Sequence, residues 1–328
     1  MISGSLPPDP CGVGDYAEYL AESLQAQHVD LQLQRLDSLS LKQIRYLSQQ
    51  RILHIQYPSR GYGISLIPQL LAVLCKPVIV TLHEFSQAHI LRKIADLPFL
   101  LFANKIIVIT EFEKASLCAL YSGFSKKIMV IPVSVTFLPK YPPPALLQRS
   151  GVAFFGLMRK EKGVESFIRL AELIQVKGIN IPVHFFSAVP NNCKKYFSEI
   201  KKMARGLNIH WHINLPLSDV SKGLSRCKYA YLYYPDGVSE RRSSFMGSVA
   251  HALIVLSNST SLTPDYLKPA FVNVRLPQEA FDKIMYFESD DKSAIVQQKQ
   301  AFDVFEQCYS PKKVSNSHIA LYESVSSK

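Results

Sequence analysis

ILHIQY (52–57), VIVTL (78–82) and KIIVIT (105–110) are short, apolar runs rich in β-branched residues. Runs of this length and composition are typical of strands in a parallel sheet that is covered on both faces. Two amphipathic stretches, 64–75 and 86–103, separate the three runs and have the pattern of surface helices. Alternation of strand and helix predicts a parallel sheet with right-handed crossovers, which is the α/β class.

The alternation continues on both sides of these runs. LQLQRL (31–36) and IMVI (128–131) are predicted strands, and 15–27, 40–50 and 111–122 are predicted helices. The first half of the chain therefore contains enough alternating elements for one complete doubly wound domain.

The alternation stops at residues 132–150 and then restarts. This part contains Pro132, Pro139 and the run Tyr141-Pro142-Pro143-Pro144. Proline cannot donate to a ladder and stiffens the chain, so the segment is a predicted linker. Six further strands follow, with helices between them: VAFFG (152–156), PVHFFS (182–187), NIHWHI (208–213), YAYLYY (229–234), LIVL (253–256) and FVNV (271–274). The sequence predicts two Rossmann-like, doubly wound domains that face a cleft, because clefts between such domains are favoured ligand sites.

These elements divide the 328 residues into four parts. We expect an N-terminal domain over 1–140, a proline-rich linker over 141–150, a second domain over 151–300 and a helical tail over 301–328. Hydrophobic residues make up 48% of the chain, which is ample for two cores.

The net charge of +11 limits the classes of partner. The positive residues are scattered, and the densest groups are pairs such as Arg241-Arg242, so the chain has no basic tail that would follow a nucleic-acid backbone. We therefore expect no nucleic-acid partner. An anionic membrane surface and a phosphorylated small molecule both fit a basic protein.

The cysteines and the apolar runs indicate a cytoplasmic protein. The six cysteines include no CxxC pair, which argues against a structural zinc site and for reduced thiols. No basic segment with an apolar run marks a signal peptide, and no run of about 18 apolar residues spans a membrane. We expect a cytoplasmic location, with peripheral contact at the inner membrane face left open.

The first glycine motif has two functional interpretations. Gly12 to Ala17 matches G-x-G-x-x-A, and Asp37 follows at the distance seen in NAD-binding domains. That reading requires a strand leading directly into Gly12, but the proline-rich segment 7–11 cannot be a central strand. A glycine loop before a helix N-terminus also suits a phosphate or a sugar, so we reject an NAD-dependent oxidoreductase.

Two later motifs combine a strand end, cations and a helix start. FFGLMRKEKG (154–163) contains three cations between a predicted strand and a predicted helix. DGVSERRSS (236–244) contains Arg241 and Arg242, and it ends at Ser243 and Ser244 in a first helical turn. Arginine forks, lysine charges and unpaired helix N–H groups all bind a diphosphate well.

These motifs form an ordered set that resembles a known family. GVGDY, HIQYP, TLHEF, ANKIIVITEFEKASL, FFGLMRKEKG and DGVSERRSS look like retaining GT-B glycosyltransferases of the family-4 type (glycosyl transferases group 1) over nearly the whole chain. The resemblance implies transfer of a sugar from a nucleotide diphosphate sugar to a glycan or lipid-linked acceptor, as in polysaccharide biosynthesis. It also implies that the tail crosses back to the N-terminal domain, and that no metal and no cofactor beyond the donor substrate is needed.

The resemblance and the residue chemistry together assign roles. The predicted catalytic residues are His83, Glu84 and Glu240. The predicted donor diphosphate site contains Gly12, Gly14, Arg159, Lys162, Arg241, Arg242, Ser243 and Ser244. The predicted acceptor side contains Asp15, Tyr16 and Tyr57. No carboxylate pair for a glycosidase-type double displacement is evident, which favours departure and attack on the same face of the sugar.

Two departures from the family pattern stand out. Many members carry an E-x7-E pair, and here Glu240 lies one residue out of register while Gly247 replaces the second glutamate, which usually holds the ribose. This loss leaves an inactive GT-B scaffold or glycan-binding subunit as the alternative. Only Met1 to Gly4 precede the proline loop, so either the first strand is truncated or the start lies upstream.

Overall fold

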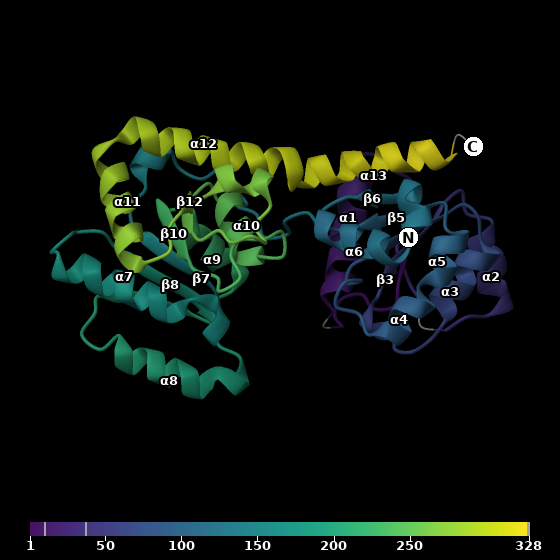
Figure 1. Ribbon diagram of the computed structural model, residues 1–328, viewed down its shortest axis with the longest axis horizontal. Helices are drawn as coiled ribbons and strands as arrows, with labels where there is room; N and C mark the ends of the chain where they lie inside the picture. The colour runs from purple at the N-terminus through teal and green to yellow at the C-terminus, as the bar shows by residue number, and fades with distance from the viewer. Residues whose placement is uncertain (10, 37, 327–328) are drawn as a thin grey trace. The chain divides into compact units, whose positions relative to one another are not determined.

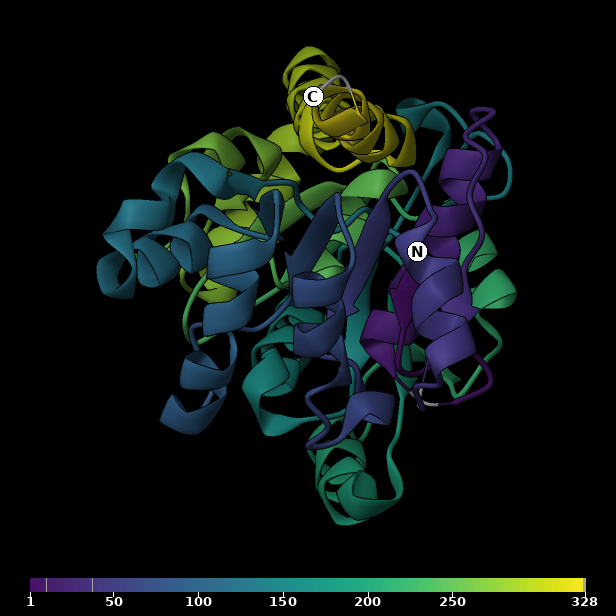
Figure 2. The same cartoon turned by 90° about the vertical axis from the view of Figure 1, so that its right-hand side faces the viewer.

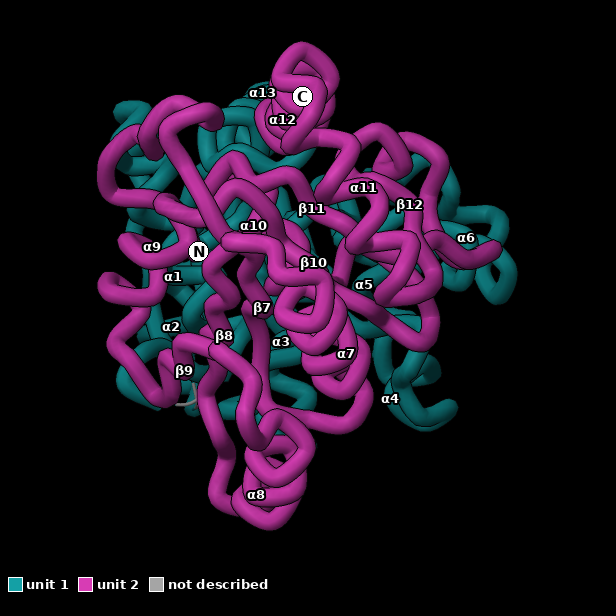
Figure 3. The backbone as a smooth tube through the Cα atoms, turned by 90° about the vertical axis from the view of Figure 1, so that its left-hand side faces the viewer, with its two compact units in different colours: residues 1–136, 308–328 teal, residues 137–307 magenta. Residues whose placement is uncertain are grey.

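The computed structural model describes residues 1–9, 11–36 and 38–326. The chain forms two compact units, shown in separate colours in Figure 3. Unit 1 contains residues 1–136 and 308–328, and unit 2 contains 137–307. The proline-rich run 141–150 thus lies within unit 2. Asp37, the acidic residue that the rejected NAD-binding hypothesis invoked, lies outside the described residues.

Unit 1 is built on a six-stranded sheet in which every pair of neighbours is parallel. The strand order is β2-β1-β3-β4-β5-β6. Its strands are β1 (Ile2–Ser3), β2 (Gln34–Arg35), β3 (Leu53–Tyr57), β4 (Val78–Leu82), β5 (Lys105–Val108) and β6 (Ile128–Val130). All five strands expected in this half of the chain are present, and β1 is the first strand in truncated form, one of the two alternatives left open by the short segment before the proline loop.

The two-residue strand β1 occupies a central position in this sheet. Ile2 pairs with Gln34 on one side and with Ile55 on the other, and its side chain is buried. A strand this short has no periodicity that a sequence pattern can detect. Its two neighbours hold it in place, since each supplies a parallel ladder.

Helices cover both faces of the sheet in unit 1 (Figures 1 and 2). They are α1 (Gly12–Gln25), α2 (Leu41–Ser48), α3 (Ile67–Leu74), α4 (Ile90–Ala95), α5 (Leu97–Phe102), α6 (Glu111–Leu120) and α13 (Pro311–Ser326). The expected single helix over 86–103 is two helices, because Pro98 lacks the N–H that a continuous helix requires. One core packs Ile55 with Phe99, and the other packs Ile79 with α1 and α13.

The last helix of the described chain belongs to unit 1 although it follows all of unit 2 in sequence. α13 packs against α1, and the hydroxyls of Ser23 and Ser315 lie 2.7 Å apart. Val314 and Leu321 enter the same buried cluster as Leu20 of α1.

Unit 2 has a second six-stranded parallel sheet, in the order β12-β11-β10-β7-β8-β9. Its strands are β7 (Val152–Leu157), β8 (Val183–Ala188), β9 (Ile209–Ile213), β10 (Tyr229–Leu232), β11 (Ile254–Ser257) and β12 (Val272–Asn273). Its helices are α7 (Val164–Val176), α8 (Lys194–Met203), α9 (Leu217–Leu224), α10 (Ser243–Ala250), α11 (Pro277–Ser289) and α12 (Asp291–Cys308), the last ending at the boundary with unit 1. Phe154 and Phe185 stack on one sheet face, with ring centroids 4.5 Å apart.

In both sheets the strand order reverses at one point. In unit 1 the reversal falls between β1 and β3, and in unit 2 between β7 and β10. Loops that leave the carboxyl ends of the strands at such a point form the usual ligand sites of open α/β sheets. The glycine loop follows β1, and the two cationic motifs follow β7 and β10.

Candidate functional site

A cavity of about 540 Å³ lies at the carboxyl ends of the strands in unit 1. Four predicted site residues contribute to its lining: Gly12, Tyr16, His83 and Glu84. The sequence places them there because Gly12 begins α1, and because His83 and Glu84 directly follow β4. Arg60 and Arg92 add positive charge to the same lining.

The two glycines of the first loop do different things. A side-chain carbon at Gly14 would lie 2.5 Å from the carbonyl oxygen of Ser5, so only glycine allows α1 to pack this closely against the loop. At Gly12 the same position is open. Gly12 therefore adds no side chain to this part of the lining, at a helix end that favours an anion or a hydroxyl.

His83 is held in one orientation by buried neighbours. Its backbone N–H donates to the carbonyl of Tyr57 at 2.9 Å, and its ring meets that of Tyr16 edge to face at 5.4 Å. Its Nε2 lies 2.8 Å from Oε1 of Gln56, which can only accept. Nε2 therefore carries the proton, and Nδ1 is left as an acceptor.

Burial also fixes the charge of His83. Desolvation, with a smaller effect from His318, lowers the pKa of His83 to about 4. The ring is neutral near pH 7, so its Nδ1 can accept a hydrogen bond from a substrate hydroxyl. Because it carries no positive charge, it does not attract a phosphate.

Glu113 fixes the loop that follows His83 and Glu84. Its carboxylate is fully buried and accepts hydrogen bonds from the N–H groups of Phe85 (3.0 Å) and Ser86 (2.7 Å) and from the Ser86 hydroxyl (2.7 Å). Glu113 lies in the first turn of α6, whose N-cap is Thr110. The α6 start is thereby tied to the end of β4, which positions His83 at the cavity.

Two predicted acceptor-side residues do not line this cavity. Asp15 is exposed on the first turn of α1. The side chain of Tyr57 lies in the core, where its ring meets Phe99 at 5.1 Å and Tyr62 at 6.2 Å. Tyr57 contributes its backbone carbonyl, which accepts from His83.

In unit 2, three cations gather after β7 and β10. Lys162 lies in a short 3-10 turn (Lys160–Lys162) after β7, and its Nζ lies 6.0 Å from the centre of the Tyr234 ring. The Arg242 guanidinium lies over the same ring at 4.7 Å. Desolvation, and then the charges of Arg242 and Arg159, lower the pKa of Lys162. These positive groups repel one another, and the carboxylates of Glu161 and Asp236 offset only part of that repulsion, so an anion beside them would be favoured.

Tyr234 is the fixed base of this cationic cluster. Its backbone N–H donates to Oδ1 of Asn258 at 2.9 Å, and Nδ2 of Asn258 returns a bond to its carbonyl at 2.7 Å. Its hydroxyl lies 2.7 Å from the hydroxyl of Ser244, in the first turn of α10. The aromatic ring thus links the two cations to the start of α10.

Arg242 is only partly satisfied. One guanidinium nitrogen pairs with the carboxylate of Asp236, while Nε is buried and has no partner among residues 1–9, 11–36 and 38–326. Arg241 and Ser243, beside it, are exposed. Glu240 accepts from the Tyr266 hydroxyl at 2.9 Å, which orients its carboxylate.

Gly247, at the position of the missing second glutamate, lies against two aromatic rings. A side-chain carbon there would come within 3.1 Å of both Phe137 and Phe155. The Phe137 ring stacks on His251 at 4.7 Å and meets Phe155 at 5.0 Å. Phe137 and Phe155 thus form an aromatic wall beside Gly247, and this wall occupies the space that a longer side chain at 247 would need.

Sequence reasoning missed several residues that organise these sites: Gln56, Arg60, Arg92, Glu113, Tyr234 and Asn258. A signal existed for Arg60, since it follows the end of β3 just as His83 follows β4. Gln56 and Glu113 carry no such signal, because their importance depends on partners distant in sequence.

Two further properties concern the described part of the chain as a whole. Within it, no group of three or more His, Cys, Asp or Glu side chains is arranged to hold a metal ion. None of its helices combines the length and the apolar character that crossing a membrane requires.

The chain is similar in structure to solved glycosyltransferases. A glycosyltransferase from Rickettsia africae ESF-5 superposes with a TM-score of 0.72 at 14% identity, over 99% of this chain and 97% of that one. Anabaena Alr3699/HepE, solved with UDP and glucose, gives 0.66 at 10% identity over 98% and 99%. Sucrose-phosphate synthase from Thermosynechococcus elongatus gives 0.61 at 12% over 95% and 93%. No protein-family model and no curated protein matches the sequence.

The fold is GT-B. Two six-stranded parallel sheets and the C-terminal helix match these neighbours over nearly the full length of each chain, as the ordered motifs predicted. A structural similarity at 10–14% identity shows the architecture alone. The function of this GT-B protein depends on the residues of its own sites.

Proposed function

We propose that this GT-B protein is a glycosyltransferase that moves a sugar from a nucleotide diphosphate sugar to a glycan or lipid-linked acceptor, with retention of configuration. The observation that carries the proposal is the cationic cluster on Tyr234, at the reversal point of the second sheet. One of the structural neighbours was solved with UDP and glucose, which is in keeping with a nucleotide sugar as donor.

The donor diphosphate is assigned to unit 2. Arg159, Lys162 and Arg242 supply positive charge, and the first turn of α10 at Ser243 and Ser244 supplies N–H and hydroxyl donors. When the bond between sugar and diphosphate breaks, the leaving group gains negative charge. Donors already held in place stabilise that charge more than they stabilise the intact donor, so they lower the barrier. In this scheme no metal ion is required.

The cavity of unit 1 is assigned to the transferred sugar and the acceptor. Neutral His83 offers Nδ1 to a sugar hydroxyl, and Gly12 lines the cavity without a side chain. Asp15, Tyr16 and Glu84 are the remaining candidates for the acceptor side and for catalysis in this unit, with Glu240 in unit 2.

Gly247 favours one alternative, an inactive scaffold that binds a glycan, because no carboxylate stands at that position. A donor screen separates the two functions. Purified protein is incubated with UDP-, GDP- and ADP-sugars, and nucleotide release and thermal stabilisation are both measured. Release with one donor supports the transferase, whereas the absence of both release and stabilisation with every donor contradicts it.

Three further measurements test the finer parts of the proposal. The anomeric configuration of the product, read by NMR, should equal that of the donor; inversion would refute retention. Activity should persist in EDTA, and loss that manganese restores would refute metal independence. We also propose a cytoplasmic protein that touches the inner membrane face through its net positive charge. It should sediment with anionic vesicles at low salt and be released as salt rises.

A further inference from the structure

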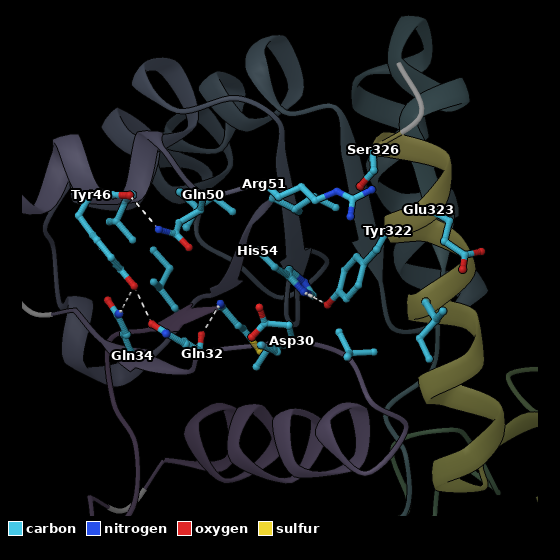
Figure 4. A pocket seen from close by; sticks show the side chains of 18 residues that line it. Asp30, Gln32, Gln34, Tyr46, Gln50, Arg51, His54, Tyr322, Glu323 and Ser326 are labelled. Atoms are coloured by element: carbon cyan, nitrogen blue, oxygen red, sulfur yellow. Dashed lines mark hydrogen bonds between the residues drawn. The ribbon is translucent and has the colours of Figure 1, made fainter.

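A second cavity, of about 410 Å³, lies in unit 1 at the amino ends of the strands (Figure 4). Its floor is the start of β3, Ile52 to His54, and its sides come from the segment 29–34 and from Tyr46 of α2 and Tyr322 of α13. It shares no lining residue with the candidate site at the carboxyl ends. Its volume falls within the range of small-molecule pockets, roughly 300–1,000 Å³.

The lining presents donors and acceptors side by side. The Tyr46 hydroxyl donates to Oε1 of Gln32 at 2.6 Å and accepts from Nε2 of Gln34 at 3.4 Å (Figure 4). These bonds fix both amides and leave Nε2 of Gln32 and Oε1 of Gln34 without a partner among the described residues. Gln50 adds a third amide, anchored through Nε2 to the carbonyl of Tyr46 at 3.1 Å.

The far side of the cavity is organised by a buried histidine. His54 is 2% exposed; Nδ1 lies 2.7 Å from the Tyr322 hydroxyl, and Nε2 lies 2.8 Å from Oγ1 of Thr81 and 3.4 Å from Nε2 of Gln56. The Gln56 amide can only donate through Nε2, so His54 accepts there and donates from Nδ1 to Tyr322. The Tyr322 hydroxyl keeps its own proton to donate.

The charges exclude some classes of ligand. Arg51 lines the cavity and forms no ion pair with any described residue, but Asp30 and Glu323 line it too. An anion would meet the carboxylate of Asp30, and a polycation would meet Arg51. A neutral ligand can hydrogen-bond to both Asp30 and Arg51, because its hydroxyl groups both donate and accept. Val29, Leu31 and Ile52 supply apolar surface for its C–H faces.

We propose that this cavity is a second binding site, for a neutral saccharide of one or two units. The site is separate from the proposed donor and acceptor sites, so the inference stands whether or not the protein transfers sugar. A hydrogen-bonded chain, Tyr322–His54–Gln56–His83, runs from this cavity to the candidate site. A saccharide that forms a hydrogen bond with Tyr322 would therefore contact one end of this hydrogen-bond series, and His83 is at its other end.

The test is an NMR titration of the full chain labelled with ¹⁵N. Glucose, N-acetylglucosamine and maltose are the probes, and inorganic phosphate is the anionic comparison. We expect saccharides to shift backbone amides of 29–34, 50–54 and 319–326. Arg51→Ala should weaken the affinity about tenfold or more, since a hydrogen bond from a charged donor is lost. Arg45→Ala is the matched control, because Arg45 is an exposed arginine on α2, six residues before Arg51, and lies outside the lining.

Each other outcome overturns the proposal. If saccharides shift no amide in these segments, or shift only those near Cys11 to Tyr16 and His83, the cavity is not a saccharide site. If phosphate binds there more tightly than the saccharides, the ligand class is wrong. Equal weakening by Arg51→Ala and Arg45→Ala would show that general surface charge, and not the cavity, sets the affinity.

Discussion

Replacing Glu113 tests how strongly one buried carboxylate holds the loop at the candidate site. Alanine would remove the acceptor of three donors: the buried N–H group of Phe85, and the half-buried N–H and hydroxyl groups of Ser86. Each unsatisfied buried group costs about 1–3 kcal/mol, so Glu113→Ala should lower the free energy of unfolding by about 3–5 kcal/mol. That is a large share of the roughly 5–15 kcal/mol by which proteins are stable.

Glutamine at the same position should behave differently. Its Oε1 can accept both backbone N–H groups, and its Nε2 can donate to the Ser86 hydroxyl, which turns its own proton away. The loss should then be about 1–2 kcal/mol, because neutral hydrogen bonds replace charged ones. Glu111→Ala is the matched control: Glu111 lies in the same first turn of α6 but is exposed, so its removal should cost less than about 1 kcal/mol.

The assay is urea unfolding followed by two signals. Trp211, the single tryptophan, lies in unit 2, so its fluorescence follows that unit while far-UV circular dichroism follows both. The Glu113→Ala variant should shift only the dichroism transition of unit 1. The reasoning is refuted if Glu113→Ala costs no more than Glu111→Ala, or if glutamine is as harmful as alanine.

Three more predictions concern the cationic cluster, the aromatic wall and the buried histidines. Arg242→Ala should reduce kcat/KM about ten- to a hundredfold, partly through kcat, while exposed Lys160→Ala loses much less; equal losses would indicate a diffuse positive patch. Gly247→Glu should destabilise unit 2 by about 1–3 kcal/mol through overpacking alone, measured by urea unfolding, and unchanged stability would contradict the wall. Burial lowers the pKa values of His83 and His318 to about 4, so between pH 6.5 and about 4 the unfolded chain binds more protons than the folded chain. The free energy of unfolding of unit 1 should therefore decrease as the pH is lowered through this range. The decrease should be less steep in His318→Leu.

Most of the fold follows from periodicity that the sequence displays. Runs such as VIVTL become strands at the expected residues, because their apolar character fits only a sheet covered on both faces. A truncated first strand was one of two alternatives for the start of the chain, and the pattern could not decide between them because two residues have no period. The break between α4 and α5 was missed, and it reflects a single proline. Both are local details that pairing and packing determine.

The candidate site was predictable where a residue follows a strand end. Gly12 and His83 reach the cavity for that reason, as Lys162 reaches the cluster in unit 2. The choice of Tyr57 ignored alternation along β3, which sends Gln56 to the His83 side and Tyr57 to the opposite core. Gln56 and Tyr234 could not be found from the sequence, because their roles arise from contacts between distant segments.

The return of residues 308–328 to unit 1 has a consequence for biosynthesis. A ribosome makes the first 136 residues well before α13, so the apolar surface of α1 that α13 covers stays exposed to solvent while all of unit 2 is translated. Unit 2 is continuous in sequence and can fold as soon as it emerges, whereas unit 1, although synthesised first, must finish last. During translation, chaperones should therefore engage nascent chains through the surface of Leu20 and Leu24.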